Sequence, residues 1–434
     1  MAMKPKQKAL LLLMALALAS AINARGETLE ECQELAQQNY PLIKRSGMLQ
    51  QAQAYTLSNI SKGWLPQVSA TAQGTYQSDV VSLPDQLLSM LQQLGSEIKG
   101  MKKDQYRIGI DVQQMLYDGG EISARRSQSN AQLAVDMAKT DVELYAVRSK
   151  VNDLYFSILL LDERLAINAE KQRLLQANED RLTEMLKGGV AMECDRDAVR
   201  AERLTTKQQA SMLVMQRQAA LAMLNLFCGR SIDTLNKPEH PTMLIAGNAD
   251  DVRRPELALY DSQIALTQSS EKVLKSALMP KLGLFAQGYY GYPGYNMYDD
   301  MFRHRFTLNG MVGARITWNI GNLYSHKNNM ATLANRREQI ENDRETFLLN
   351  TRIGSAQERS MIEGYNRVVS DDDEIIGLLT DVRLATEAKL KHGIVDVTSL
   401  IQQIVNENQA KINKSNHEIE QLQHIYNLKY INNY

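Results

Sequence analysis

The segment from Gly120 to Lys187 contains no proline and no internal glycine, so no residue in it would break a helix. Within it, apolar residues recur at alternating intervals of three and four, which is the spacing of a coiled-coil seam. They are Leu144, Val147, Val151, Leu154, Ile158, Leu161 and Leu165. A helix of about 68 residues would be roughly 100 Å long at 1.5 Å per residue. Because this is several bilayer thicknesses, such a helix must project out of any membrane that holds it.

Four landmarks recur in the same order in the two halves of the chain, and this order indicates an internal duplication. They are Pro41 and Pro255, Pro66 and Pro280, Leu116–Gly120 and Trp318–Asn322, and Gly189 and Gly393. Both proline pairs are 214 positions apart (255 − 41 and 280 − 66), whereas the glycines are 204 apart (393 − 189). The offset falls because the first copy carries a longer insert, over 79–104, between its second proline and the glycines that follow its strands.

The first residues have the three-part layout of a secretory signal peptide. Lys4, Lys6 and Lys8 precede the apolar run Leu10–Leu18, and small residues that offer a cleavage site follow it. We expect residues 1–24 to be removed during export; the alternative is a retained anchor. No later apolar run approaches the roughly 20 residues of a spanning helix, so membrane insertion would require strands in a closed barrel.

The two repeats, 25–250 and 251–434, are expected to share one order of elements: a helix, two strands, a long helix, a tight turn and a return helix. Alternating apolar and polar residues predict the strands. The apolar positions are Val68, Ala70, Ala72, Ile108, Ile110 and Val112 in the first copy and Leu282, Leu284, Ala286, Leu308, Val312 and Ile316 in the second. Such strands fit the roughly 10-residue spans of a membrane barrel, whereas the alternative is a small soluble sheet. Since a membrane barrel needs at least about eight strands, a chain with four must oligomerise.

Aromatic residues lie at both ends of the predicted strands. Trp64 precedes the first strand and Trp318 ends the fourth, which places both at one rim. Tyr289 and Tyr290 begin a group of aromatic residues at the opposite rim. Two such girdles are typical of the interfaces between a bilayer and water, although a packed tyrosine-rich loop would have the same composition.

The other helices are predicted from caps and from shorter seams. The first is expected over Thr28–Gly63, and Thr28 with Glu31 forms a capping box at its start. The first return helix is expected over Met192–Cys228, with a seam of Met212, Met215, Ala219, Ala222 and Leu226. The second copy repeats this spacing at Ile394, Val397, Ile401 and Ile404. We interpret the methionines as seam filler rather than as metal ligands.

Composition and motifs argue against several classes of function. The net charge of −1 does not favour a nucleic-acid partner. The chain has only six Phe and two Trp among 434 residues, a composition typical of long helices with narrow apolar seams. His417 lacks the second histidine four residues later that a zinc-protease helix requires. The acidic run Asp371–Glu374 is interpreted as solvated surface. We therefore expect no enzyme activity, cofactor or metal site.

The order of these landmarks resembles that of the TolC-like outer-membrane factors, and the resemblance covers essentially the whole mature chain. It rests on Pro41, Trp64–Pro66, Tyr117–Gly120 and the duplicated glycine turns. The resemblance implies a homotrimer with a twelve-stranded β-barrel in outer-membrane lipid, continued by an α-helical coiled-coil tunnel in the periplasm. It also implies two partners, a periplasmic adaptor protein and an inner-membrane pump or ABC exporter.

The resemblance also assigns roles to residues at the helix reversals, where glycine readily supplies the left-handed conformation. The expected adaptor-contact tips are Gly189, Val190, Ala191, Gly393, Ile394 and Val395. The expected tunnel-entrance gate consists of Asp195, which matches a family aspartate, with Asp396 and Ser399. The family's basic partner and acidic pair are not present at the matching positions Val395, Ser399 and Gln402. A ring of carboxylates that included Asp396 would favour cations.

The sequence thus predicts a passive exit duct of the Gram-negative outer membrane, in a tripartite efflux or type I secretion system whose partners supply the energy. A duct dedicated to protein secretion or to metal ions is the alternative within this class. A periplasmic coiled-coil scaffold or adaptor that never enters the membrane is the alternative from another class. An adaptor usually has one hairpin, whereas this chain duplicates both the strand pair and the hairpin.

Overall fold

A computed structural model describes residues 28–95, 98, 100–230, 241 and 252–433. The expected signal peptide and the boundary between the repeats at 250 and 251 lie outside these residues. The chain divides into two compact units. The first combines 1–47, 137–259 and 342–434, and the second combines 48–136 and 260–341. Each unit therefore contains segments from both expected repeats.

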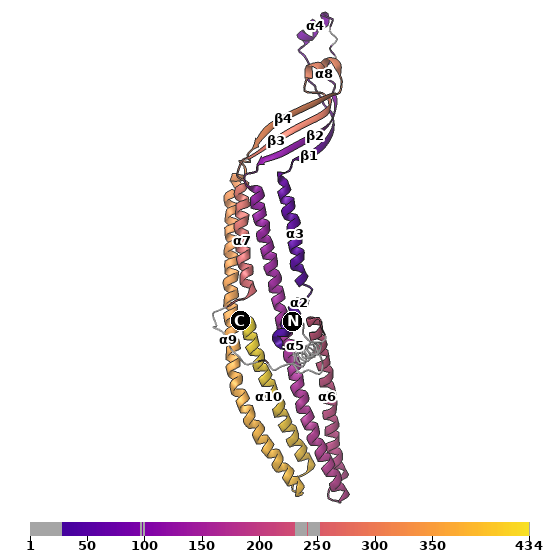
Figure 1. Cartoon of the computed structure of the whole chain (residues 1–434), viewed down its shortest axis with the longest axis vertical. Helices are drawn as coiled ribbons and strands as arrows, with labels where there is room; N and C mark the ends of the chain where they lie inside the picture. Colours follow the sequence, from indigo (N-terminus) through magenta and orange to yellow (C-terminus); the bar gives the residue numbers. More distant parts are fainter. Residues whose placement is uncertain (1–27, 96–97, 99, 231–240, 242–251, 434) are drawn as a thin grey trace, which may run out of the picture. The chain divides into compact units, whose positions relative to one another are not determined.

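Two helical hairpins make up most of the first unit (Figure 1). The first consists of α5 (Glu121–Lys187, 67 residues) and α6 (Glu193–Cys228, 36 residues), and the second of α9 (Asn322–Lys391, 70 residues) and α10 (Val397–Asn432, 36 residues). The N-terminal parts of α5 and α9 extend into the second unit. The predicted long helix, tight turn and return helix are thus confirmed in both copies. Among the described residues, no helix has a stretch long and apolar enough to cross a membrane.

The single N-terminal helix expected over Thr28–Gly63 is wrong, because two helices replace it. They are α2 (Leu29–Asn39) and α3 (Ile43–Ser61). Pro41 disfavours a helical conformation at the preceding residue, and Tyr40 is extended with φ −62° and ψ 127°. The capping box is confirmed, since the Glu31 N–H donates to Thr28 Oγ1 at 3.2 Å and the Thr28 N–H donates to Glu31 Oε2 at 3.0 Å.

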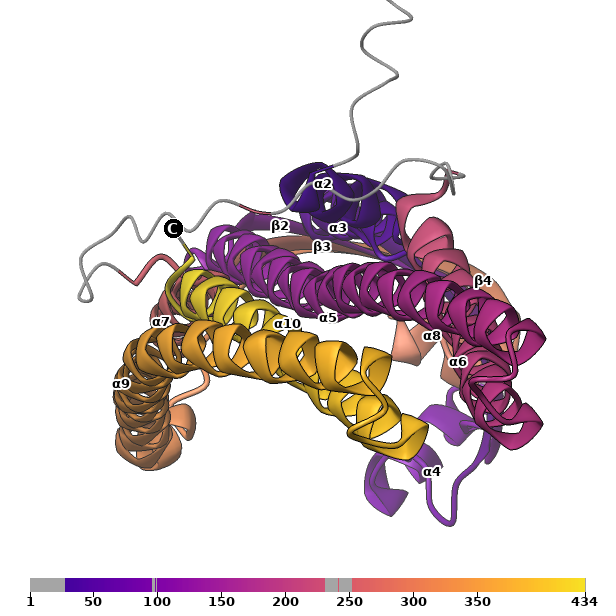
Figure 2. The ribbon, with the colours of Figure 1, turned by 90° about the horizontal axis from the view of Figure 1, so that it is seen from below.

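The core of the first unit confirms most of the seam predicted on α5. Val147, Val151 and Ile158 are almost fully buried, and Leu144 and Leu161 are also buried. They pack in a layer in which α10 lies between α9 and α5, and α6 lies beside α5 (Figure 2). Side-chain contacts also link these helices, since Asp372 of α9 binds His417 of α10, Lys411 of α10 binds Glu170 of α5, and Lys171 of α5 binds Glu202 of α6.

The seam predicted on α6 is not packed against any helix of this chain. Met212, Met215 and Leu226 are 54%, 60% and 80% exposed, and Ala219 and Ala222 are exposed as well. The buried face of α6 consists of Val199, Thr206, Ala220, Leu221, Leu224 and Cys228. This face also makes a polar contact with α5, because the side-chain amide of Asn168 donates a hydrogen bond to the Thr206 carbonyl at 3.1 Å. The helix therefore carries two periodic faces, and the face predicted from spacing is the one that other helices of the chain leave uncovered.

The second unit contains a four-stranded antiparallel sheet in the order β1-β2-β3-β4 (Figure 1). The strands are β1 (Gln67–Tyr76), β2 (Asp104–Tyr117), β3 (Lys281–Tyr292) and β4 (Thr307–Thr317). Short helices interrupt the two hairpin loops: α4 (Asp85–Gln93) lies in the 79–104 insert and α8 (Met297–Arg303) between β3 and β4. Helix α7 (Pro255–Ser276) precedes β3.

The register of the sheet confirms the predicted alternation. One row across the four strands consists of Val68, Val112, Ala286 and Val312, and another of Ala72, Ile108, Tyr290 and Leu308. On the opposite face, one row consists of Ser69, Asp111, Gln287 and Met311. Val312 is 81% exposed and Leu308 82% exposed, so this monomer leaves the apolar face uncovered. The sheet also has two unlike open edges, β1 and β4.

Candidate functional site at the helix reversals

The two hairpin turns have the same backbone geometry. Gly189 has φ 71° and Gly393 has φ 69°, the left-handed conformation that the sequence predicts. In the first turn, the Val190 N–H donates to the Met185 carbonyl at 2.9 Å and the Gly189 N–H to the Leu186 carbonyl at 3.0 Å. In the second, Ile394 and Gly393 make the equivalent bonds to Lys389 and Leu390, at 3.0 and 2.9 Å. Both long helices thus end in a Schellman motif, which satisfies carbonyls of their last turns.

The residues that follow these glycines separate into exposed and packed positions. Val190 is 73% exposed and Ile394 is 70% exposed. Ala191 and Val395, one position further on, pack against a buried cluster. This cluster contains Leu175, Leu182, Val199, Leu390, Val397, Leu400 and Ile404, so it joins the ends of both hairpins. Of the expected contact residues, Val190 and Ile394 are therefore the ones whose apolar side chains are most exposed.

The expected gate residues cap the return helices. The Asp396 Oδ1 atom accepts bonds from the Ser399 N–H at 2.8 Å and from the Ser399 hydroxyl at 2.5 Å, and this makes Asp396 the N-cap of α10. These bonds, the hydroxyl bond first, lower the pKa of Asp396 from its usual value. In α6, Asp195 Oδ2 accepts from the Met192 N–H at 3.1 Å. The structure brings Asp396 and Ser399 together, and Asp195 lies three residues after the N-cap residue Met192 of α6, the place that Ser399 has in α10.

A chain of alternating charges links the hairpins close to these turns. Arg181 of α5 binds Glu387 of α9 at 2.9 Å, and Arg383 contacts both Glu387, at 3.4 Å, and Glu407 of α10. Lys411 of α10 then binds Glu407 at 3.0 Å and Glu170 of α5 at 2.7 Å. We call this set of six residues (Arg181, Glu387, Arg383, Glu407, Lys411 and Glu170) the ionic chain. It begins and ends on α5, so it ties the second hairpin to the first.

Hydrogen bonds keep Glu407 and Lys411, the two central residues of the ionic chain, in their charged forms. Burial alone would raise the pKa of Glu407, but hydrogen bonds from Arg383 and Lys411 outweigh it and lower that pKa below its usual value. Burial would likewise lower the pKa of Lys411, but bonds to Glu170 and Glu407 raise it. Glu407 and Lys411 are therefore both charged at neutral pH. No local sequence pattern indicated the ionic chain, because most of the residues that it pairs lie 24 to 241 positions apart.

The acidic run Asp371–Glu374 is not simply solvated, so that interpretation is wrong in part. Asp372 is buried, and its Oδ2 lies 2.6 Å from Nδ1 of His417 on α10. Asp373 accepts a bond from Lys414 at 2.6 Å. These acids hold α9 against α10. Across the described residues, no group of three or more His, Cys, Asp or Glu side chains could hold a metal ion.

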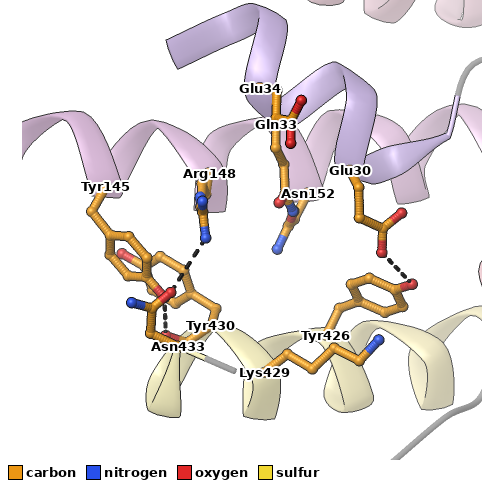
Figure 3. A pocket seen from close by; sticks show the side chains of 10 residues that line it. All are labelled: Glu30, Gln33, Glu34, Tyr145, Arg148, Asn152, Tyr426, Lys429, Tyr430 and Asn433. Atoms are coloured by element: carbon orange, nitrogen blue, oxygen red, sulfur yellow. Dashed lines mark hydrogen bonds between the residues drawn. The ribbon is translucent and has the colours of Figure 1, made fainter. Parts of the chain in front are cut away.

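A polar cavity of about 200 Å³ lies between α2, α5 and α10 in the first unit (Figure 3). Tyr426 donates to Glu30 at 3.0 Å, and Arg148 donates to Asn433 Oδ1 at 3.3 Å. The Nε atom of Arg148 is buried and has no hydrogen-bond partner. Burial raises the pKa of Tyr145 to about 12, so its hydroxyl stays protonated and donates to the Tyr430 carbonyl at 2.6 Å. Hydrogen bonds among the residues that line this cavity join α2, α5 and α10.

The expected interface aromatics lie at the two ends of the sheet. The start of β1 is in register with the end of β4, so Trp64 and Trp318, which are exposed, flank one end. Tyr290 is exposed in an apolar row near the other end and stacks on Phe306. Tyr289 points to the opposite face, is buried, and donates to the Pro293 carbonyl at 3.1 Å.

Comparisons with known proteins find similar outer-membrane channels. The chain is 27% identical over 248 residues to the pyoverdine export outer membrane protein OpmQ of Pseudomonas aeruginosa, and the match covers 53% of this chain. The chain spans about half, 49%, of the length of that curated relative. No model of a protein family matches the chain.

Solved structures give a longer match. The outer-membrane channel OprN has a TM-score of 0.65 at 15% identity, with 94% of this chain and 93% of that chain covered. The outer membrane protein VceC of Vibrio cholerae has a TM-score of 0.63 at 12% identity, with coverage of 93% and 94%. The chain thus has the fold of outer-membrane channels, and its resemblance to TolC-like outer-membrane factors is confirmed. These relatives are named as outer-membrane proteins, in agreement with the predicted location.

Proposed function

We propose that this chain, which has a TolC-like fold, is the outer-membrane subunit of a tripartite efflux or type I secretion system. In this proposal it is a passive duct that carries its substrate across the periplasm and the outer membrane. The observation that carries the proposal is the combination, in one chain, of an uncovered apolar sheet face with two long helical hairpins. A duct needs both parts, since strands must enter the membrane and helices must cross the periplasm.

The sheet supports insertion as part of an oligomeric barrel. Its two open edges, β1 and β4, leave backbone N–H and C=O groups unpaired, and hydrocarbon does not tolerate unpaired backbone groups. Three copies would join β4 of one chain to β1 of the next and would give twelve strands. The apolar rows, such as Val68, Val112, Ala286 and Val312, would then face lipid. Trp64 and Trp318 would mark one membrane interface and Tyr290 the other.

The helix reversals support docking of a periplasmic adaptor. Each turn holds an exposed branched apolar side chain, Val190 or Ile394, on a backbone fixed by a Schellman motif. Two such side chains per chain give six in a trimer, which is a ring of small hydrophobic contacts. The adaptor would connect this ring to an inner-membrane pump or ABC exporter. We propose no catalytic role, because the named relatives are channels and an export protein.

The ionic chain and the capping acids support a role for the same end as the entrance. Asp195 and Asp396 sit in the first turns of the return helices, and Asp396 is charged at neutral pH because its pKa is lowered. Six such carboxylates in a trimer would favour cations over anions at the entrance. Opening the entrance would separate the second hairpin from the first, which requires bonds of the ionic chain to break.

The alternative is a periplasmic scaffold or adaptor that never enters the membrane, and fractionation separates the two proposals. The chain is expressed in a Gram-negative host, and the membranes are washed with alkaline carbonate. The duct predicts a trimer in the washed outer-membrane fraction, without its first 24 or so residues. Release of the whole population into the periplasmic fraction would refute the duct and favour the scaffold.

A second assay distinguishes the two kinds of partner system. A host that lacks its own duct is complemented with the chain together with either an efflux pump and adaptor or an ABC exporter and adaptor. Restored dye efflux supports the first system, and restored secretion of the exporter's protein substrate supports the second. The name of the similar Pseudomonas protein concerns pyoverdine export, and pyoverdine is therefore a third substrate to include.

A further inference from the structure

Two buried cysteines meet where the N-terminal helix α2 packs on the end of α6. Cys32 of α2 is 1% exposed and Cys228, the last residue of α6, is 4% exposed, and both belong to one buried cluster. The Cys228 thiol donates to the Cys32 carbonyl, with the sulfur 3.7 Å from the oxygen. Because a carbonyl oxygen lies roughly 2.4 Å from its own Cα, this sulfur lies within about 6 Å of the Cys32 Cα. The two residues are thus neighbours in the core, although 196 positions separate them.

The end of α6 lies close against α2 (Figure 1). The side-chain amide of Asn39, the last residue of α2, donates to the carbonyls of Leu226 and Phe227 at 3.2 and 3.1 Å. A Cβ added to Gly229 would come within 2.3 Å of Asn39, so the chain directly after Cys228 leaves no room for a side chain there. These contacts fix the end of α6 beside α2.

The orientation of the two side chains and their compartment both favour oxidation. Cys32 and Cys228 lie on the faces that α2 and α6 bury. A disulfide requires Cα atoms no more than about 7 Å apart and side chains that point toward each other. Rotation about the Cα–Cβ bonds, between staggered rotamers, is the motion that joins the two sulfurs. Outer-membrane proteins such as the relatives of this chain pass through the periplasm, where disulfides form and persist.

We propose that Cys32 and Cys228 form a disulfide within each exported chain. The oxidant is a protein disulfide of the enzymes that keep the periplasm oxidising. One cysteine thiolate attacks a sulfur of that disulfide, which gives a mixed disulfide and releases one thiolate of the oxidant. The second cysteine thiolate then attacks the sulfur of the first cysteine and releases the other thiolate. Two electrons pass to the oxidant, and its two thiolates take up protons equal in number to those that the cysteines lose.

The bond would attach a helix that has few other means of holding its place. Helix α2 has 11 residues, fewer than an isolated helix needs for stability in water. A disulfide from α2 to the end of α6 closes a loop of nearly 200 residues and so restricts the unfolded chain strongly. Cys194 cannot replace either partner, because it is exposed in the first turn of α6, roughly 50 Å along the helix from Cys228.

Peptide mapping tests the bond directly. The full chain, with its signal peptide and a Cys194→Ser substitution, is expressed in a Gram-negative host, and a maleimide in denaturant blocks all thiols at lysis. The protein is then digested with trypsin without reduction. The proposal predicts that residues 26–44 are joined to residues 218–230, with a mass two hydrogens below the sum of the two peptides. It also predicts that at least nine-tenths of the chains carry no maleimide before reduction and take up two after it.

Three controls establish that the labelling reports this pair. Cys32→Ser and Cys228→Ser, each in the same Cys194→Ser background, should take up one maleimide per chain without reduction. The unsubstituted pair, expressed in a host that lacks the periplasmic dithiol oxidase, should take up two. The main measurement is made on a chain that keeps both cysteines, so it does not depend on how well the single variants fold.

Two outcomes would overturn the proposal. If the chain from the oxidising host takes up two maleimides before reduction, the thiols stay reduced and act only as small apolar side chains of the core. If a non-reducing gel shows dimers linked through Cys32 or Cys228, the bond joins two copies rather than two helices of one chain. Neither outcome bears on the duct, because the thiol count is the same question for a membrane-inserted chain and for a periplasmic one.

Discussion

Gly189 and Gly393 end the two long helices with nearly the same backbone torsion, φ 71° and 69°, although 204 positions separate them (393 − 189). An added Cβ would have no atom within 4 Å at either glycine, so nothing but backbone strain opposes a side chain there. Because the two φ values are nearly equal, the two copies share the left-handed conformation at this turn as well as the pattern of residues. It also allows the turn to be perturbed without disturbing the neighbouring core.

The first prediction concerns the exposed side chains of the turns. Val190→Ser combined with Ile394→Ser removes apolar contact area from the tips but leaves both glycines in place. We expect a normal trimer yield in the outer membrane and a loss of dye efflux or secretion of tenfold or more. Leu204→Ser is the control, because Leu204 is 51% exposed on α6 and lies away from the turns. Normal export by the double variant would refute the docking role.

The second prediction separates strain from contact at the same site. Gly393→Val puts a branched residue at positive φ and should cost about 1 kcal/mol or more, while the surrounding space accommodates the side chain. We expect export to fall while insertion and trimer formation persist, because the strain is confined to the turn. Leu400→Ala is the contrasting variant, since Leu400 is buried in the cluster that joins the hairpins. It should lower the trimer yield together with export.

The third prediction concerns the ionic chain. Lys411→Met breaks the contacts of Lys411 with Glu170 and Glu407 and should weaken the attachment of the second hairpin by about 1 to 2 kcal/mol. We expect larger single-channel conductance in planar bilayers and greater uptake of large antibiotics. Lys187→Met is the matched control, because Lys187 pairs with Glu184 on the surface of one helix. An unchanged conductance for Lys411→Met would show that this chain does not restrain the entrance.

The fourth prediction is a dependence on acid. The pKa of Glu407 is lowered in the folded protein relative to a usual value of 4.5. Its contribution to stability is therefore present above about pH 4.5 and is lost as the pH falls through the lower folded pKa. We expect protease resistance of the α9–α10 hairpin to be constant from pH 7 to 5 and to decline below about pH 4.5. Glu407→Gln should show a smaller decline, and an identical acid response in both proteins would contradict the assignment.

The fifth prediction concerns the faces of the sheet. Val312→Asp places a charge in an apolar row that would face lipid, at a cost of up to about 2 to 4 kcal/mol near the middle of the membrane. Met311→Asp, one residue earlier, places the same charge on the opposite face beside Gln287. We expect Val312→Asp to reduce the heat-modifiable trimer strongly and Met311→Asp to leave it intact. Equal trimer yields would mean that the apolar rows do not contact lipid.

Local patterns predicted most of the fold. The absence of proline and glycine after Gly120 predicted α5, and alternation predicted which residues of the four strands share a face. The positive φ of Gly189 and Gly393 followed from the same reasoning, because a helix that reverses needs a left-handed residue. These features depend on neighbouring residues, which is why one sequence without relatives was enough to predict them.

Features that depend on partners distant in sequence were missed or misassigned. The ionic chain joins Glu170 to Lys411 across 241 positions, and no local pattern indicates that pairing. The seam on α6 was real as a pattern, but periodicity does not say whether a face meets its own chain or another one. Asp372 was taken for solvated surface because its partner, His417, lies 45 positions away on another helix.

The two different open edges of the sheet, β1 and β4, also affect how the exported chain assembles. A newly exported copy would carry unpaired strand edges until it meets others, and open edges of this kind promote aggregation. Its folded state would then depend on protomer concentration, as for other obligate oligomers. Low expression should therefore yield chains that are degraded rather than small amounts of a folded monomer. Periplasmic chaperones that hold unassembled strands would set the yield of the assembled protein.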